Sequence, residues 1–386
     1  MKTKYTEFII DCLNGRINPE TIEKIRQDEW QPIIELAKKK QLSAIIFFNL
    51  KQSNLLHSLP TFVNEELENA HYCVLTQNTI ILKELTKLLK ALNQLDIKPI
   101  ILKGVALINT VYDGNFSLRP MVDIDILIPP EQLGATKQCL KELGYEIDMA
   151  DFGSTTYKLK DNENLNLLNT PYLEIHWHIL HKKFNRVLNI DERIFWQRAK
   201  TFKMEDVDYL GLSCEDNILY LSLHLILIHF FSNILWLYDI KRIIETQKDD
   251  ISWDRLLKTA NDSGTRNVIY YCLAFCKDIL GVSLDTKIIE RFSPSSFKKK
   301  TISCFLKKDY ILENSDLDRV SYIVQLLMLG MKEMIKLAIT NIFPDRELLA
   351  YRYPNEPYFK AYLTYVLRPL RILLATILCG KQRAFN

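Results

Sequence analysis

The sequence lacks the features that define several large classes of protein. It has eight cysteines in 386 residues, but they show neither the paired CxxC spacing of a zinc ribbon nor the pattern of a disulfide framework. Lysine and arginine number 50 against 47 aspartate and glutamate, and a formal charge of +3 does not by itself require a nucleic-acid partner. The N-terminal residues contain no uninterrupted apolar stretch of the kind that forms a signal peptide. We therefore expect a cytoplasmic protein whose thiols are reduced and mostly buried.

Long apolar runs are also scarce. Residues 218–237 approach the roughly 20 residues that span a bilayer, but two histidines, a serine and an asparagine interrupt them. A buried helix of a large soluble protein accounts for this segment better than a membrane span does. A second run, 363–378, contains two arginines and a proline. We expect it to be a docked C-terminal helix, and contact with a membrane surface is the alternative.

The pattern of apolar residues divides the chain into three parts. Residues 1–95 and 183–386 show mainly the three- and four-residue periodicity of helices. The segment between them predicts strands at 97–102, 122–128, 145–147 and 173–179, helices at 105–112 and 131–143, and a hairpin or loop at 161–166. We therefore predict an α+β fold with an N-terminal helical region (1–95), an α/β core (96–182) and a C-terminal helical region (183–386).

Two aspartates inside an apolar strand are the most informative feature. Ionised carboxylates rarely enter such runs unless something offsets their desolvation, as a bound cation does. Side chains two apart in a strand point to the same face, so Asp123 and Asp125 project together while the alternate residues face the core: Val122, Ile124 and Ile126. Such a pair can share one divalent metal and help to hold a second. A sheet end whose aspartates reach solvent or pair with lysines is the alternative.

A turn upstream of the aspartates is suited to phosphate. Lys103 and Gly104 follow one predicted strand and precede a helix, and the free backbone N–H groups of a helix N-terminus bind phosphate. Lys103 can add a cation beside a triphosphate, or it is simply an exposed turn lysine. Arg119, four residues before Asp123, can neutralise phosphate or clamp a carboxylate of the site.

A third carboxylate lies in the last predicted strand of the core. Alternation places Glu174 on one face with His176 and His178, and places Ile175 and Trp177 inward. Glu174 can complete a metal shell or deprotonate an acceptor hydroxyl, and a structural glutamate paired with a lysine is the alternative. The three nearby histidines, at 176, 178 and 181, do not have a common zinc spacing and have no cysteine beside them. We expect no zinc there, and we expect the lysine cluster at 298–308 to be a solvated helix face.

These motifs together resemble a known family. The stretch ILKGVALINTVYDGNFSLRPMVDIDIL, at 101–127, is similar to bacterial proteins described as uncharacterised nucleotidyltransferases, which belong to the polymerase β-like superfamily. The similarity extends, more weakly, to 173–179, 223–243 and 343–354. The turn in that superfamily is usually Gly-Gly or Gly-Ser, whereas this chain has Lys103-Gly104.

The resemblance implies a small mixed-sheet nucleotidyltransferase core flanked by helical regions. It implies transfer of a nucleoside monophosphate from a triphosphate, ATP by default, to a hydroxyl acceptor, with release of pyrophosphate and with two Mg²⁺ ions. Asp123, Asp125 and Glu174 would hold the metals, and Lys103 with Gly104 would hold the β- and γ-phosphates. The resemblance also suggests that His224, His229 and Asp239, in the C-terminal region, line the nucleotide cleft. The two histidines are equally well explained as core residues.

The resemblance leaves the acceptor open. It could be a small molecule, a protein hydroxyl or an RNA end. A protein that keeps this fold but only binds a nucleotide or a partner, without catalysis, is the alternative, because the turn at Lys103 is atypical.

Overall fold

The structure, a computed structural model, describes most of the chain in two compact units, Met1–Leu329 and Gly330–Asn386. The described residues are 4–150, 154–159, 171–180, 182–306, 321–343, 346, 349, 350, 353 and 355–367. The loop predicted at 161–166 and residues 368–378 of the predicted C-terminal helix lie outside them. The second unit contains α18 (Met331–Ile342) and a helical segment at 358–367.

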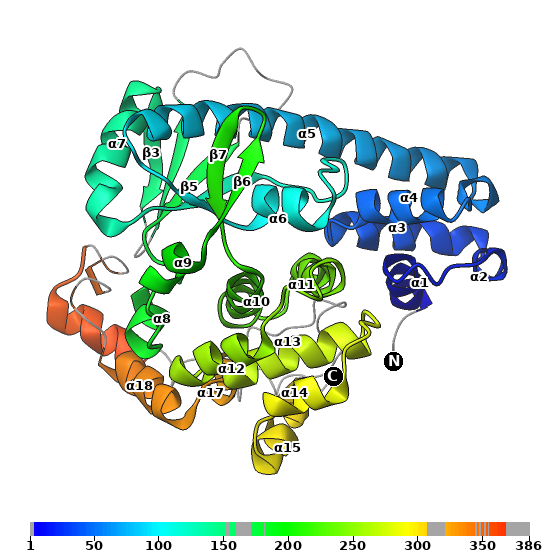
Figure 1. The fold of residues 1–386 in the computed structure, drawn as a ribbon. Helices are drawn as coiled ribbons and strands as arrows, with labels where there is room; N and C mark the ends of the chain where they lie inside the picture. Colours follow the sequence, from blue (N-terminus) through cyan, green and yellow to red (C-terminus); the bar gives the residue numbers. More distant parts are fainter. Residues whose placement is uncertain are drawn as a thin grey trace. The chain divides into compact units, whose positions relative to one another are not determined.

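The N-terminal region is helical, as predicted. Its elements are α1 (Lys4–Leu13), α2 (Pro19–Glu23), η1 (Gln27–Glu29), α3 (Trp30–Lys39), α4 (Ser43–Gln52), η2 (Leu56–Ser58) and α5 (Thr61–Gln94). Helix α5 has 34 residues, and its first half packs on α3 and α4. Its second half carries a buried stripe at three- and four-residue steps that packs on the sheet (Figure 1): Ile81, Leu85, Leu88, Leu89 and Leu92.

A seven-stranded mixed sheet forms the centre of the first unit, which confirms the α+β class. Its strands are β1 (Ile100–Ile101), β2 (Asp123–Leu127), β3 (Tyr145–Ala150), β4 (Ser154–Leu159), β5 (Tyr172–His176), β6 (Lys200–Met204) and β7 (Val207–Gly211). The strand order is β3-β4-β5-β2-β1-β7-β6. The pairs β2–β5 and β1–β7 are parallel and the others are antiparallel. Strand β2, with the two aspartates, therefore lies in the middle of the sheet.

One face of the sheet is covered by helices and the other carries the carboxylates. Helix α6 (Lys103–Val111) joins β1 to β2, and η3 (Pro130–Gln132) with α7 (Leu133–Glu142) joins β2 to β3. Ile124 and Ile126 pack into one core with residues of α5 and α7. The prediction that Val122 also faces the core is wrong, since it is 60% exposed. Strand β2 begins one residue later, so the alternation of the strand does not govern Val122.

The β6–β7 hairpin joins the sheet from the segment that was expected to be mainly helical. It follows α8 (Lys182–Val187) and α9 (Arg193–Arg198), and β7 pairs with β1 at the centre of the sheet. The sheet therefore extends past residue 182, where the sequence analysis ended the α/β core.

The long apolar segment after β7 is two helices, where the sequence analysis expected one. Helix α10 (Cys214–Leu223) continues into a π-helical turn, η4 (His224–Ile228), and α11 (Ile234–Thr246) begins after a break. Phe230 and Phe231 adopt positive φ angles of 47° and 60°, which no helix can accommodate. The side chain of Asn233 then caps α11 by accepting from Leu235 N. No helix among the described residues is long and apolar enough to cross a membrane.

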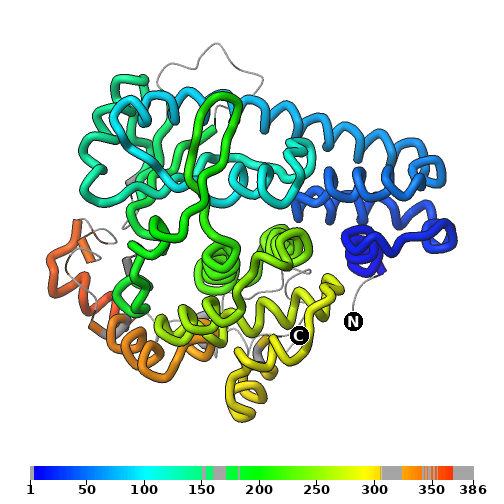
Figure 2. Tube along the Cα trace, viewed as in Figure 1, coloured from blue at the N-terminus to red at the C-terminus, as the bar shows by residue number. Residues whose placement is uncertain are grey.

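Further helices complete the first unit. They are α12 (Trp253–Asp262), α13 (Arg266–Asp278), α14 (Thr286–Arg291), α15 (Ser296–Phe305) and α17 (Ser321–Met328). The chain closes on itself where Asn14 Nδ2 donates to Ile279 O at 3.4 Å, and Figure 2 shows the blue N-terminal segment beside that yellow-green region.

In the lysine cluster, Lys299 pairs with Glu290 at 3.2 Å and Lys300 is exposed. Seven cysteines are described, all are free thiols, and five are buried, which agrees with the prediction.

Candidate active site

Two parallel strands bring the candidate site together. In the β2–β5 register Asp125 lies opposite Glu174, and Leu127 lies opposite His176. Ser154, at the start of β4, lies opposite His176 on the other side of β5. Because side chains alternate along each strand, these polar groups share one face of the sheet, opposite the face that packs on α5 and α7.

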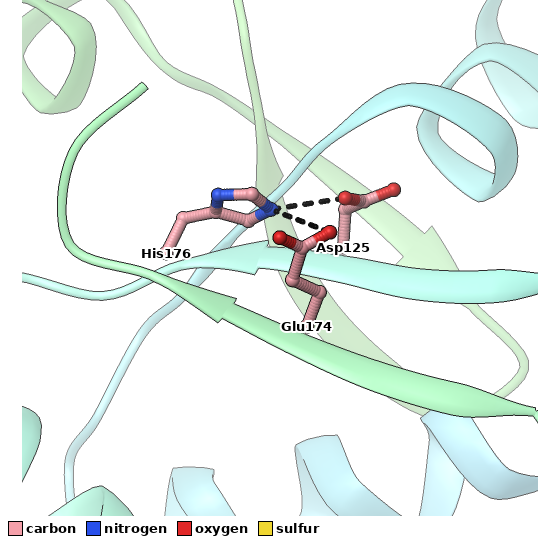
Figure 3. A group of neighbouring side chains, drawn as sticks. All are labelled: Asp125, Glu174 and His176. Carbon is pink, nitrogen blue, oxygen red and sulfur yellow. Dashed lines mark hydrogen bonds and ion pairs between the residues drawn. The ribbon is translucent and has the colours of Figure 1, made fainter. Parts of the chain in front are cut away.

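The three side chains Asp125, Glu174 and His176 converge on one point (Figure 3). His176 Nε2 lies 3.0 Å from Asp125 Oδ1 and 3.5 Å from Glu174 Oε2. Ser154 Oγ donates to the second oxygen, Glu174 Oε1, at 2.8 Å. One potential ligand atom from each of the three lies within 4.8 Å of the others, and this is the single group of this kind among the described residues. The arrangement fits one divalent cation, because two anionic oxygens and an imidazole nitrogen face the same small volume.

Lys103 also reaches this group, and it is not the exposed turn residue that was the alternative. Its Nζ lies 2.8 Å from Asp125 Oδ1, and its side chain is only 13% exposed. Lys103 begins α6 with a positive φ of 49°, a conformation that is costly outside glycine. The turn therefore directs the ammonium group onto the carboxylates.

Gly104 has a clear packing role. A Cβ atom at this position would lie 2.4 Å from Met121 Sδ and 2.7 Å from Met121 Cγ. Any side chain at this position would force the buried Met121 side chain to shift. A role for its backbone in phosphate binding stays a prediction.

The charges of the site perturb one another strongly. The charge on Asp125, with burial, raises the pKa of Asp123 to about 6. Burial alone would raise the pKa of Asp125, but the Lys103 ammonium and the hydrogen bond from His176 outweigh burial and lower it. Burial is likewise outweighed at Glu174, whose pKa is held well below its usual range by the hydrogen bond from His176. Hydrogen bonds to the two carboxylates overcome burial at His176 and raise its pKa to about 9. Three carboxylates thus face two protein cations, which leaves an excess of negative charge.

Asp123 lies at the edge of the group. It begins β2 two residues before Asp125, on the same face of the strand, and the charge on Asp125 raises its pKa. It does not belong to the set of converging ligand atoms. A role in holding a metal stays a prediction for Asp123.

Arg119 is committed to a different carboxylate. Its Nη2 lies 3.0 Å from Asp239 Oδ2, and its Nη1 donates to Pro120 O at 3.0 Å. Tyr112 Oη donates to Asp239 Oδ1 at 2.6 Å. The pair is almost fully enclosed, with side chains 7% and 0% exposed. Arg119 therefore clamps α11 to the segment before β2, and a phosphate role for it stays a prediction.

A cleft of about 150 Å³ opens beside the metal-ligand group. It is lined by Lys103, Ser154, Glu174, His176, His178, Ile179, Leu180, His224, Ile228 and His229. Both histidines of the long apolar segment line it, as the resemblance suggests, whereas Asp239 does not. His224 Nε2 lies 3.0 Å from Ile179 O, and burial holds the pKa of His224 well below its usual range. His224 is therefore neutral and donates Nε2–H to that carbonyl.

The histidines at the end of β5 and after it meet different partners. His176 meets the carboxylates of the site, while His178 Nδ1 pairs with Glu192 at 2.8 Å. His181 lies outside the described residues. His176 is the one residue of the converging group to which the sequence analysis gave no role, although its spacing from Glu174 already placed it on the same face.

This fold and site define the class of the protein. A central pair of strands aligns two carboxylates and a histidine, beside a turn that delivers a lysine at the start of a helix. Residues 26–281 match the family described as uncharacterised nucleotidyltransferase, and the chain belongs to that family. The matched segment includes all seven strands and extends through α13. No curated protein matches the chain.

Proposed function

We propose that the protein is a metal-dependent enzyme that transfers a nucleoside monophosphate from a nucleoside triphosphate to a hydroxyl acceptor. The acceptor hydroxyl gives its proton to water as its oxygen attacks the α-phosphorus in line, the bond from that phosphorus to the bridging oxygen breaks, and pyrophosphate leaves. The observation that carries the proposal is the convergence of Asp125 and Glu174 on one point beside Lys103. Membership of the nucleotidyltransferase family supports the reaction class.

The carboxylates of the site supply the ligands. Divalent cations, two Mg²⁺ ions in the first instance, stabilise the attacking and leaving oxygens when bound. Asp125 and Glu174 would hold the shared cation, and Asp123 would provide a further oxygen. Glu174 lies opposite Asp125 in the β2–β5 register and contributes a ligand atom to the same converging group, so we assign it to metal binding rather than to removal of the acceptor proton.

Lys103 and the cleft are assigned to the phosphates of the triphosphate. With a cation held by Asp125, the Lys103 ammonium would be free to bind the β- and γ-phosphates at the N-terminus of α6. The cleft volume of about 150 Å³ is small beside the roughly 300–1,000 Å³ of pockets that enclose a whole small-molecule ligand. We therefore place the phosphates in the cleft and the nucleoside outside it. ATP is the default donor, and the acceptor is a small molecule, a protein hydroxyl or an RNA end.

A direct test follows the nucleotide. The purified protein is incubated with each α-³²P-labelled triphosphate, Mg²⁺ or Mn²⁺, and cell extract, and the species that carries the label is isolated. Glu174→Gln is expected to lower the rate at least about 10²-fold, because a neutral amide holds a cation poorly. Exposed Asp113→Asn is the matched control and should keep the wild-type rate. Equal labelling by wild type and Glu174→Gln would refute the assignment.

One observation favours a second candidate, a nucleotide-binding protein without catalysis. Lys103 already satisfies Asp125 Oδ1, the oxygen that a catalytic cation needs. The two candidates differ in the fate of a bound triphosphate. A binding protein returns it intact after prolonged incubation with metal and extract, whereas the enzyme releases pyrophosphate in step with labelling.

A further inference from the structure

The converging group contains one ligand type that the proposed reaction does not need. Two of its members are carboxylates, which suit Mg²⁺, and the third is the imidazole of His176. His176 is 6% exposed, and its Nε2 points at both carboxylates rather than toward solvent (Figure 3). A nearby histidine that only shaped the cleft would not need this orientation. His178, for comparison, points to Glu192.

The separations of the three atoms fit neighbouring positions on one metal ion. Ligands at right angles around an ion with bonds of about 2.1 Å lie about 3.0 Å apart. His176 Nε2 lies 3.0 Å from Asp125 Oδ1 and 3.5 Å from Glu174 Oε2. To bind one ion, His176 Nε2 gives up its proton, and the cation replaces the contacts that Lys103 and His176 make with Asp125 Oδ1.

The surrounding contacts orient the same atoms. Ser154 Oγ binds Glu174 Oε1, which leaves Oε2 as the oxygen that faces His176. This is the role that outer hydrogen-bond partners play at metal sites, where they fix which ligand atom faces the ion.

We propose that His176 binds the catalytic cation directly through Nε2, together with Asp125 and Glu174, and that the site therefore prefers a first-row transition ion such as Mn²⁺ to Mg²⁺. The catalytic part of this inference rests on the proposed function, but the metal site itself does not. Mg²⁺ takes oxygen ligands almost exclusively, whereas Mn²⁺ accepts the same octahedral carboxylate ligands and binds imidazole nitrogen more readily.

Pulsed electron paramagnetic resonance tests the ligand without any nucleotide. Mn²⁺ bound to the full-length protein should show electron spin echo modulation from a directly bound imidazole ¹⁴N. Protein grown with ¹⁵N-histidine should show the ¹⁵N pattern in its place, so the test does not depend on a variant that folds. His176→Gln, which can still offer an oxygen, should lose the imidazole signal. His178→Gln is the matched control from the same cleft and should keep it.

Calorimetric titration tests the preference. Wild type is expected to bind Mn²⁺ at least about 10-fold more tightly than Mg²⁺, and His176→Gln to lose at least about 10-fold in Mn²⁺ affinity while Mg²⁺ affinity changes less than about threefold. Bound Mn²⁺ without imidazole coupling in the wild type, or equal affinities for the two ions, would overturn the proposal. Nitrogen coupling without nucleotide transfer would overturn the proposed function and leave this site standing. Mg²⁺-supported nucleotide transfer without imidazole nitrogen coupling to bound Mn²⁺ would leave the proposed function standing and overturn the assignment of His176 as a metal ligand.

Discussion

Two buried clusters of charge in this protein differ in their charge balance and in how far they are enclosed. Around Asp239, one carboxylate meets one guanidinium and one tyrosine hydroxyl, and the pair is enclosed. Around Asp125, three carboxylates meet two protein cations beside an open cleft. Burial of an ion pair is tolerable when the charges balance and hydrogen bonds are complete, as at Asp239. The unbalanced cluster has capacity for a further cation, and we therefore place function there and structure at Asp239.

The largest expected effect is the loss of activity in Asp125→Asn. The variant removes the negative charge of the carboxylate that meets His176 and Lys103, and the lost stabilisation of several kcal/mol corresponds to at least about 10³-fold in transfer rate. Its two cations also lose a partner, so we expect lower thermal stability as well. The rate of labelled-nucleotide transfer and the Tm measure the two effects. A folded variant with wild-type turnover would remove the basis of the comparison.

Arg119→Ala should lower stability without weakening metal binding. It leaves Asp239 buried with an uncompensated charge, which typically costs about 3–5 kcal/mol. Urea unfolding measures the loss. Calorimetry on the folded variant should find Mn²⁺ affinity within about threefold of wild type, because Arg119 is not a ligand. A loss of metal affinity without a loss of stability would contradict the assignment of a structural role to the Asp239 cluster and a functional role to the Asp125 cluster.

Lys103→Ala should weaken nucleotide binding. A charge-assisted contact to phosphate contributes roughly 1.5 to 3 kcal/mol, or about 10- to 150-fold in affinity. The loss should be greater for ATP than for AMP, because the contact is to the β- and γ-phosphates. Calorimetric titration at matched metal concentration and ionic strength measures the difference, with exposed Lys98→Ala as the control. Equal weakening of both nucleotides would mean that Lys103 serves only to neutralise Asp125.

The smallest effect concerns the pH dependence of stability at Asp123. Its pKa in the folded protein, about 6, lies above the ordinary aspartate value of 3.8, so the folded state holds this proton more tightly. The resulting stabilisation is complete below about pH 4 and is lost as pH rises through about 6. Asp123→Asn should therefore gain about 1–2 kcal/mol relative to wild type between pH 4.5 and 7.5. Urea titrations with a chelator present measure this gain, and a pH-independent difference would contradict it.

The period of two along the strands predicted which residues share a face of one strand, but not that β2 and β5 pair. It placed Asp125 on one strand face and Glu174 with His176 on another, and the structure sets these strands side by side in register. It could not predict that the partner of Arg119 is Asp239, because that contact joins residues 120 positions apart. Long-range pairing depends on the packing of α11, and no local pattern encodes it.

Local backbone conformation explains why the sequence pattern did not predict the β6–β7 hairpin or the break after η4. The β6–β7 hairpin turns at Glu205, which adopts a φ of 53° without the glycine or asparagine that usually marks such a turn. The break after η4 occurs at Phe230 and Phe231, which are apolar and read as a continuing helix. In both places tertiary packing holds residues in conformations that their own preferences disfavour.

The close passage of Gly104 past Met121 restricts how this turn can change over evolution. A serine or alanine at 104 would place its Cβ inside the contact distance of the Met121 thioether, so that single step is penalised wherever it is tried. A smaller residue at 121 opens a cavity, which is the milder of the two defects. The two positions are therefore epistatic, and lineages that acquire a side chain at 104 are expected to have reduced residue 121 first.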